Sequence, residues 1–253
     1  MEPLEAELDR ARDLDVAELA DAIESIGFEC TRCGGCCTGY APDEPGGAPA
    51  DEDESEVDSK ADGDRDRDDR EPHTATVFPD EVREVADAAV DGAYDWRDVA
   101  RPMPYGLAAG EDGDPAGETF EWALATDDCG DCTFYEESDG RGACTVHDSR
   151  PLICRTYPFS VALGGTSQPM GEAVDGEGIV RAHECEGLGR DIAREDAESL
   201  AAALKERAIR ELEEAIAVRD GYDPTAAERA DGDVVVFDSE GPKHADGTPI
   251  GGE

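Results

Sequence analysis

The sequence predicts an α+β fold, in which packed helices and short strands surround an irregular centre. Three observations lead to this class. Apolar residues recur at helical spacing near both ends of the chain, and short runs rich in Val and Thr lie between them. Nine cysteines, most of them in two clusters, occupy segments with no regular periodicity. A chain of 253 residues is long enough for one domain with a core, or for one domain with tails.

Residues 1–27 are predicted to form two helices. The first has Leu4, Leu8 and Ala11 on one face. The second begins at the capping-box variant 15–18, has an apolar stripe along one face and ends at Gly27. The first cysteine cluster begins three residues later, at Cys30.

An acidic insertion is predicted at about residues 41–72. Between Asp51 and Glu71, 12 of 21 residues are Asp or Glu. A segment of this composition cannot bury enough apolar surface to offset the entropy of ordering, so we expect it to be disordered.

The remaining elements are short, except for one long helix. Residues 93–117 are expected to be irregular. The elements predicted after the insertion are a strand at 74–78, a helix opened by Pro79, a strand at 118–126, a long helix at 195–219 and a last strand at 233–237.

The formal net charge is −43, from 65 acidic and 22 basic residues, of which only three are Lys. At low ionic strength, repulsion among so many acidic side chains destabilises the compact state. Salt near molar concentration screens most of this repulsion. The composition therefore predicts a protein of an extreme halophile. The alternative is an acidic partner for a basic molecule. Direct nucleic-acid binding is disfavoured, because no basic patch exists to neutralise phosphates.

The chain is predicted to be cytoplasmic. No apolar stretch approaches the length of a membrane span, and the acidic N-terminus lacks the pattern of a signal peptide. In a reducing cytoplasm, cysteines are poor candidates for disulfides and good candidates for metal ligands.

The first cysteine cluster is Cys30-x2-Cys33-x2-Cys36-Cys37. Two cysteines separated by two residues can bring both thiolates to one ion on a tight turn, at about 2.3 Å for zinc. The intervening Gly34-Gly35 permits the turn. Adjacent cysteines cannot easily point at the same ion, so Cys36 and Cys37 are expected to diverge, either toward different sites or with one outside the ligand shell.

The second region supplies further thiols. They are Cys129, Cys132, Cys144, Cys154 and the more distant Cys185. Two four-coordinate sites would use eight of the nine cysteines. The first cluster overlaps the first three ligands of bacterial ferredoxins. The fourth part of that pattern, three residues followed by Cys-Pro, is missing, because Cys37 comes next and then Thr38. Zinc accepts irregular spacings, so spacing leaves zinc and an iron–sulfur cluster both open.

Two kinds of side chain lie near the cysteines in sequence. His147 could complete a zinc site, and His183 precedes Cys185 by two residues; both are more often surface or supporting groups. Arg150 and Arg155 flank Cys154 in an otherwise acidic chain. A metal held by four thiolates is a net anion, so these guanidinium groups are candidates to stabilise the cofactor.

The cysteine segments resemble the YkgJ-type cysteine-cluster proteins, which are described as zinc- or iron-chelating domains. The first matching segment is 30–37. The second runs from Cys132 through Cys144 and 147–159, and the third is Cys185-Glu-Gly187-Leu-Gly189. The resemblance covers about residues 28–37 and 74–190. It departs at His147, where the family often has Tyr, at Cys129, which is additional to the family set, and in the acidic insertion.

The resemblance implies a metal-binding protein that chelates an iron–sulfur cluster or zinc. The implied ligands are Cys30, Cys33, Cys36, Cys37, Cys132, Cys144, Cys154 and Cys185. We predict a metal-binding domain over 28–219, interrupted by the acidic insertion at about 41–72, preceded by the N-terminal helices at 1–27 and followed by a tail at 220–253 with a short strand. An iron–sulfur oxidoreductase, an electron carrier, a structural zinc protein and a metal-transfer factor are alternatives. No catalytic residue or protein partner is indicated.

Overall fold

The computed structural model describes residues 3–40, 71–88, 94–110, 113–139, 141–163, 173–175, 178–230 and 233–251. Over these residues the chain forms helices and several small sheets, which confirms the predicted α+β class. None of the described helices is both long and apolar enough to cross a membrane.

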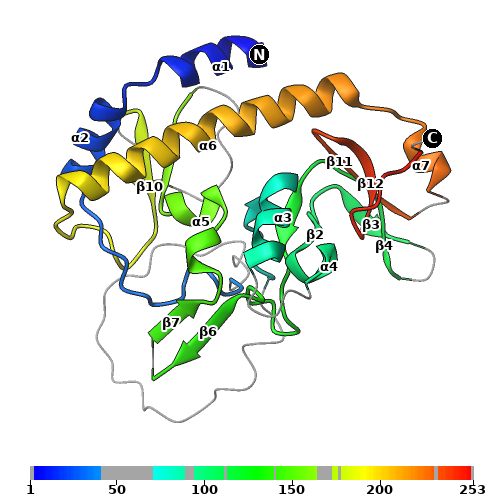
Figure 1. Cartoon of the computed structure of the whole chain (residues 1–253), viewed down its shortest axis with the longest axis horizontal. Helices are drawn as coiled ribbons and strands as arrows, with labels where there is room; N and C mark the ends of the chain where they lie inside the picture. The colour runs from blue at the N-terminus through cyan, green and yellow to red at the C-terminus, as the bar shows by residue number, and fades with distance from the viewer. Residues whose placement is uncertain are drawn as a thin grey trace, which may run out of the picture.

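Most of the helical residues lie in one long helix and in two shorter helices at the N-terminus. The helices are α1 (Leu4–Asp13), α2 (Val16–Ile26), α3 (Pro79–Ala88), α4 (Trp96–Val99), α5 (Leu152–Thr156), α6 (Arg194–Gly221) and α7 (Ala226–Arg229). A 3-10 turn, η1, covers His147–Ser149. Helix α6 runs the length of the molecule, from α2 at one end to α7 at the other (Figure 1).

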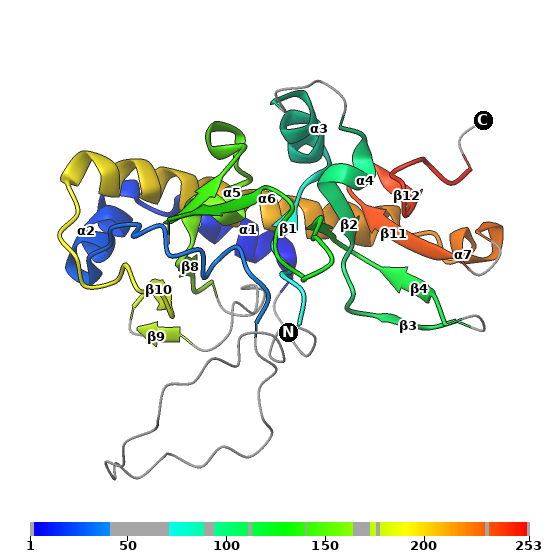
Figure 2. The same cartoon turned by 90° about the horizontal axis from the view of Figure 1, so that it is seen from below.

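The strands are short and form four small sheets. They are β1 (Thr76–Val77), β2 (Ala100–Pro102), β3 (Leu107–Ala109), β4 (Pro115–Thr119), β5 (Trp122–Leu124), β6 (Tyr135–Ser138), β7 (Arg141–Cys144), β8 (Phe159–Val161), β9 (Ala173–Asp175), β10 (Val180–His183), β11 (Val234–Asp238) and β12 (Gly241–His244). The strand orders are β1-β5-β2, β8-β10-β9, β12-β11-β4-β3 and the hairpin β6-β7. The sheets lie along α6, with β9–β10 near one end of the molecule and β3–β4 and β11–β12 near the other (Figure 2).

The N-terminal helices form as their sequence predicts. The Asp15 side chain accepts hydrogen bonds from the backbone N–H groups of Ala17 and Glu18, at 2.8 and 3.2 Å, and so caps α2. Gly27 ends this helix with a φ of 78°. The apolar faces of α1 and α2 pack with α6, β8 and β10 in the first core cluster.

The prediction of an irregular segment at 93–117 is wrong. The structure places α4, β2 and β3 there, and β4 begins at Pro115. Asp95 and Asp98 form a capping box that starts α4. Strands of three residues carry too little periodicity to be recognised, and they exist here because β2 pairs with β5 and β3 with β4.

The predicted strand at 118–126 is two strands in different sheets. The chain leaves β4 at Thr119 and enters β5 at Trp122. Strand β4 lies parallel to β11, the strand expected at 233–237, whereas β5 is antiparallel to β1 and β2. The Trp122 indole donates to the Asp238 carboxylate at 2.8 Å, and the buried Lys243 ammonium also donates to it, so the two sheets are linked by a buried polar group.

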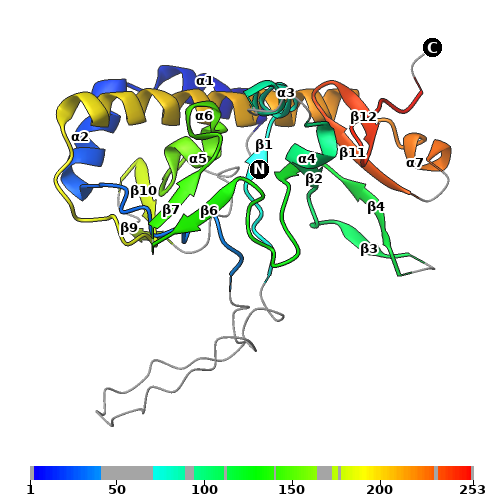
Figure 3. The same ribbon diagram turned by 60° about the horizontal axis from the view of Figure 1, so that its bottom comes forward.

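A second core cluster packs α3 and α4 against the β1-β5-β2 sheet. The loops that carry most of the cysteines meet this cluster on the side away from α6, next to the β6-β7 hairpin (Figure 3). The predicted acidic insertion lies outside the described residues except at its end. There, Tyr40 and Glu71 exchange two backbone hydrogen bonds of 2.9 and 2.8 Å, so the insertion leaves and rejoins the fold at one point.

Candidate metal centre

The two cysteine motifs, distant in sequence, are joined by backbone hydrogen bonds. The N–H of Cys132 donates to the carbonyl of Cys37 at 2.8 Å. The N–H of Gly142, in the β6-β7 hairpin, donates to the carbonyl of Arg32 at 2.8 Å. These backbone hydrogen bonds hold the first motif against the second.

The turn of the first motif requires glycine at position 34. Gly34 has a φ of 82°, and the N–H of Cys37 donates to its carbonyl at 2.7 Å. A Cβ atom at this position would lie 2.1 Å from the hydroxyl oxygen of Tyr135. The close approach of the Tyr135 ring therefore shields the turn and excludes any side chain there.

The loop that carries Cys185 lies alongside the start of the first motif. Glu29 donates its N–H to the carbonyl of Gly187 at 3.0 Å, and Gly189 donates to the carbonyl of Gly27 at 3.0 Å. A Cβ at position 187 would lie 2.3 Å from the Glu29 carbonyl oxygen. Only glycine allows this contact, which brings Cys185 toward the first motif.

Four of the cysteines pack against the second core cluster, and we call them the inner set. They are Cys37, Cys132, Cys144 and Cys154. Burial, together with the charges of Cys144 and Cys36, raises the pKa of the Cys132 thiol to about 11. Burial also raises the pKa of Cys154, with further contributions from Cys132, Cys36 and Cys144. These effects place Cys132, Cys144 and Cys154 near one another and near the exposed Cys36.

The other four cysteines of the predicted site form the outer set. They are Cys30, Cys33, Cys36 and Cys185. The first three are exposed, and Cys185 is half-buried. Burial raises the pKa of Cys185, and the charges of Cys33, Cys36 and Cys30 add to this effect, which places all four near one another.

Cys36 and Cys37 connect the two sets. Their sulfur atoms are 3.8 Å apart, within the range of a hydrogen bond that involves sulfur. The contact with Cys37 lowers the pKa of Cys36 to about 7, whereas the contact with Cys36 raises the pKa of Cys37. The two adjacent cysteines have different surroundings, because Cys37 packs against the second core cluster whereas Cys36 is exposed.

The ninth cysteine and the two histidines singled out from the sequence do not join either set. Cys129 is exposed, in a turn where Asp127 accepts its N–H at 2.8 Å. His147 is exposed, with its Nδ1 3.4 Å from the Asp148 carboxylate. His183 is buried and its Nε2 lies 2.8 Å from the Ser160 hydroxyl.

The two arginines near Cys154 have different surroundings. The charge of Arg150 lowers the pKa of Cys144 and of Cys154 against the larger effect of burial, so its guanidinium lies near the inner set. Its Nε donates to the His147 carbonyl at 3.0 Å. Arg155 is exposed on α5, where its backbone N–H donates to the Pro151 carbonyl at 3.0 Å.

His73 is a supporting residue that the sequence did not reveal. It is 3 % exposed, and its Nε2 lies 3.0 Å from the carbonyl oxygen of Cys36. Burial lowers the pKa of His73 to about 4, so the ring is neutral at neutral pH and Nε2 carries the proton that it donates. Arg101 donates in turn to the His73 carbonyl at 2.7 Å. The only signal in the sequence is its position, immediately after the acidic insertion.

The donor chemistry fits zinc or iron, both of which bind thiolates well. Within the described ranges, no three Cys, His, Asp or Glu side chains are arranged around one point at ligand distances.

Comparison with known proteins adds one match. The family model CxxCxxCC, described as "Putative zinc- or iron-chelating domain", matches residues 29–186. This range contains all nine cysteines and confirms the resemblance noted from the sequence. No curated protein and no solved structure matches the chain.

Proposed function

The chain belongs to the CxxCxxCC family of zinc- or iron-chelating domains, and on that basis we propose that eight of its cysteines bind metal at two separate sites. One site uses the inner set and the other the outer set. The observation that carries this proposal is the division of the thiols between a core-packed group and an exposed group, with the adjacent Cys36 and Cys37 on opposite sides of it.

Each set contains four thiols, the number that completes a tetrahedral zinc site or holds an iron–sulfur cluster. Metal at the inner set would tie the first motif to α5 and to the β6-β7 hairpin. A closed structural site of this kind contributes on the order of 10 kcal/mol to folding. Arg150 would offset the negative charge of four thiolates there, and we expect Arg155 to contribute less because it is exposed.

The exposure of the outer set favours one further function, that of an electron carrier. Cys30, Cys33 and Cys36 are open to solvent, so an iron–sulfur cluster at this set would be accessible to a redox partner. A zinc ion in the same place would be accessible to a metal acceptor instead. The first outcome makes the protein an iron–sulfur redox protein, and the second a zinc protein with a structural or transfer role.

Metal analysis distinguishes these outcomes. The protein is purified anaerobically in molar salt, and its iron, acid-labile sulfide, zinc and visible absorption are measured per chain. Iron with sulfide and a colour that bleaches reversibly with dithionite supports the redox function. A colourless protein with two zinc ions per chain supports the structural or transfer role.

Single substitutions test the division into two sites. Cys154→Ser should remove metal from the inner set and destabilise the fold, whereas Cys33→Ser should remove metal from the outer set and leave the fold intact. Cys129→Ser is the matched control and should keep all of the metal. A wild-type protein that holds one ion or one cluster in total, or a Cys129→Ser variant that loses metal, would contradict the proposal.

A further inference from the structure

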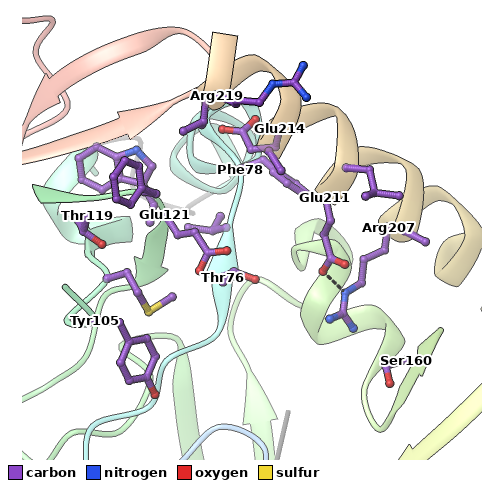
Figure 4. A pocket seen from close by; sticks show the side chains of 18 of the residues that line it. Thr76, Phe78, Tyr105, Thr119, Glu121, Ser160, Arg207, Glu211, Glu214 and Arg219 are labelled. Carbon is purple, nitrogen blue, oxygen red and sulfur yellow. Dashed lines mark hydrogen bonds and ion pairs between the residues drawn. The ribbon is translucent and has the colours of Figure 1, made fainter. Parts of the chain in front are cut away.

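A cavity of about 610 Å³ lies between α6 and the strands that face it. Figure 4 shows α6 on one side and the segments that carry Thr76, Thr119 and Glu121 on the other. None of the residues that line the cavity is a cysteine, so it is separate from the candidate metal centre. Its volume is in the range of small-molecule sites in proteins, about 300–1,000 Å³.

The walls of the cavity are mainly apolar. Most of the lining residues carry an aliphatic or aromatic side chain. Among them, Leu204 and Leu212 of α6 belong to the first core cluster, and Trp122 of β5 belongs to the second. All three are almost completely buried. The cavity therefore lies between the two core clusters, and a ligand inside it would contact both.

Aromatic rings that are open to water also line the cavity. Tyr105, Phe120 and Tyr222 are 64 %, 46 % and 42 % exposed. The buried Phe237 supports two of these rings, because its ring centroid lies 5.7 Å from that of Phe120 and 4.8 Å from that of Tyr222. Exposed rings beside an apolar cavity form a surface that a flat ring can cover.

The positive charges on the wall already have partners within the protein. The buried Arg207 donates to the Glu211 carboxylate at 2.7 Å, and Figure 4 marks this contact. Arg219 pairs with Glu5 at 2.7 Å and with Asp220 at 2.8 Å. An anionic ligand would have to displace these carboxylates.

The negative charges on the wall are engaged as well. Glu211 is held by Arg207, and the Glu214 carboxylate accepts the backbone N–H of Ser239 at 2.7 Å. Glu121, the third carboxylate on the wall, is not free either. A cationic ligand would therefore have to compete for carboxylates that already have partners.

The surroundings of these groups also penalise a charge that enters the cavity. Burial raises the pKa values of Glu211 and Glu214, because water solvates their charged forms poorly. A charged ligand would lose its own hydration in the same place, and the protein offers no unengaged opposite charge among the described lining residues to compensate. An uncharged ligand avoids this cost.

We propose that this cavity binds an uncharged, mainly apolar molecule that contains a flat aromatic ring. The ring covers the exposed aromatic faces and the apolar wall of α6. Hydroxyl groups on the wall, such as those of Thr76 and Tyr105, can hydrogen-bond to one neutral polar group of the ligand (Figure 4). The site is independent of the metal proposal, because it uses no cysteine.

The test compares three probes that share one ring system and differ in charge. They are the neutral 2-naphthalenemethanol, the cationic 2-naphthylmethylamine and the anionic 2-naphthoate. Each is titrated by calorimetry into the full-length, metal-loaded protein in 1 M KCl, which screens the long-range attraction of the net charge of −43 for the amine. We expect the neutral probe to bind about tenfold or more tightly than either charged probe, a difference of about 1.4 kcal/mol.

Two variants locate the binding. Ala215→Phe, at a half-buried lining position of α6, should fill the cavity and abolish binding of the neutral probe. Its matched control is Ala202→Phe, the same change at an exposed position of α6 that does not line the cavity, which should bind like the wild type. Tyr105→Ala removes a mostly exposed ring and should weaken the neutral probe about fivefold.

Circular dichroism and metal content are measured on the same samples, so that loss of folding or of metal is distinguished from loss of the cavity. Three results would overturn the proposal. The first is that the wild type binds none of the probes, and the second is that a charged probe binds as tightly as the neutral one. The third is that folded Ala215→Phe or Tyr105→Ala protein binds the neutral probe as tightly as the wild type does.

Discussion

His73 supports the cysteine site without contributing a thiol. Its ring holds the backbone carbonyl of Cys36, at the point where the inner and outer sets meet. Replacing His73 by Leu leaves that carbonyl without its donor, which should cost about 1–3 kcal/mol of stability. Removal of a group that orients a ligand should also weaken metal binding about 10- to 100-fold.

Competition with a chelator measures the affinity of the His73→Leu variant, and thermal unfolding measures its stability. The matched control is His147→Gln, because His147 is exposed and lies within the second cysteine region. An unchanged affinity in His73→Leu would show that Cys36 is held without it.

Arg150 and Arg155 offer a comparison at one site. Arg150 lowers the pKa of Cys144 and Cys154, opposing the effect of burial. In Arg150→Gln the two thiols should keep their protons to higher pH. Because protons compete with metal for thiolates, the pH at which half of the metal is lost should rise, and affinity at neutral pH should fall about tenfold.

Arg155→Gln should leave that midpoint where it is, because Arg155 is exposed on α5. The measurement is metal retained after equilibration over a series of pH values. Equal midpoints for the two variants would remove the assigned role of Arg150.

At the scale of single elements, the loop after β10 brings Cys185 to the first motif through one close contact. Gly187→Ala would place a methyl group against the Glu29 carbonyl oxygen and push the two segments apart. We expect a loss of about 1–3 kcal/mol in stability and loss of metal from the outer set, while the inner set stays loaded.

The control for this substitution is Gly221→Ala at the end of α6, where a Cβ would meet no atom within 4 Å. Metal content per chain distinguishes the two variants. If Gly187→Ala keeps its full metal content, the loop does not position Cys185 as described.

Helix α6 carries an ion pair between Arg207 and Glu211, and the buried arginine also joins α6 to α5 through a hydrogen bond. Arg207 bonds to Glu211 and to Thr156, two residues after Cys154. Arg207→Met leaves Glu211 buried without its partner, which should cost about 3–5 kcal/mol. The double variant Arg207→Met/Glu211→Leu removes both charges and should recover most of that loss. Denaturant unfolding of the three proteins measures the difference, and a double variant no more stable than the single one would contradict the ion-pair explanation.

The charge of the whole molecule should determine its response to salt. The net charge of −43 is spread over the chain, and its self-repulsion is screened over about 3 Å in 1 M salt but over about 30 Å in 0.01 M salt. We expect the unfolding temperature to rise steadily as KCl is added. Sucrose of equal osmolality is the control, since it does not screen charge. An unfolding temperature that responds equally to both solutes would show that repulsion is not limiting.

Short elements are what the sequence could not predict in this fold. The periodicity within each segment predicts α1, α2, α3, α6 and β11, and the cap at Asp15 adds to the prediction of α2. Strands β2, β3 and β5 have three residues each, too few for a period to appear. Strand β2 depends on pairing with β5, and β3 on pairing with the nearby β4. The division of 118–126 between two sheets follows from pairing with β11 on one side and with β1 on the other.

The identity of the candidate ligands and the family come from the sequence alone, because thiol spacing and the glycines between thiols are local properties of the chain. The division of the eight thiols into inner and outer sets, the support from His73 and the cavity beside α6 depend on the tertiary structure. Backbone contacts such as Cys132 to Cys37 and Glu29 to Gly187 join segments far apart in sequence. Burial, which separates Cys37 from Cys36, exists only once those segments have packed.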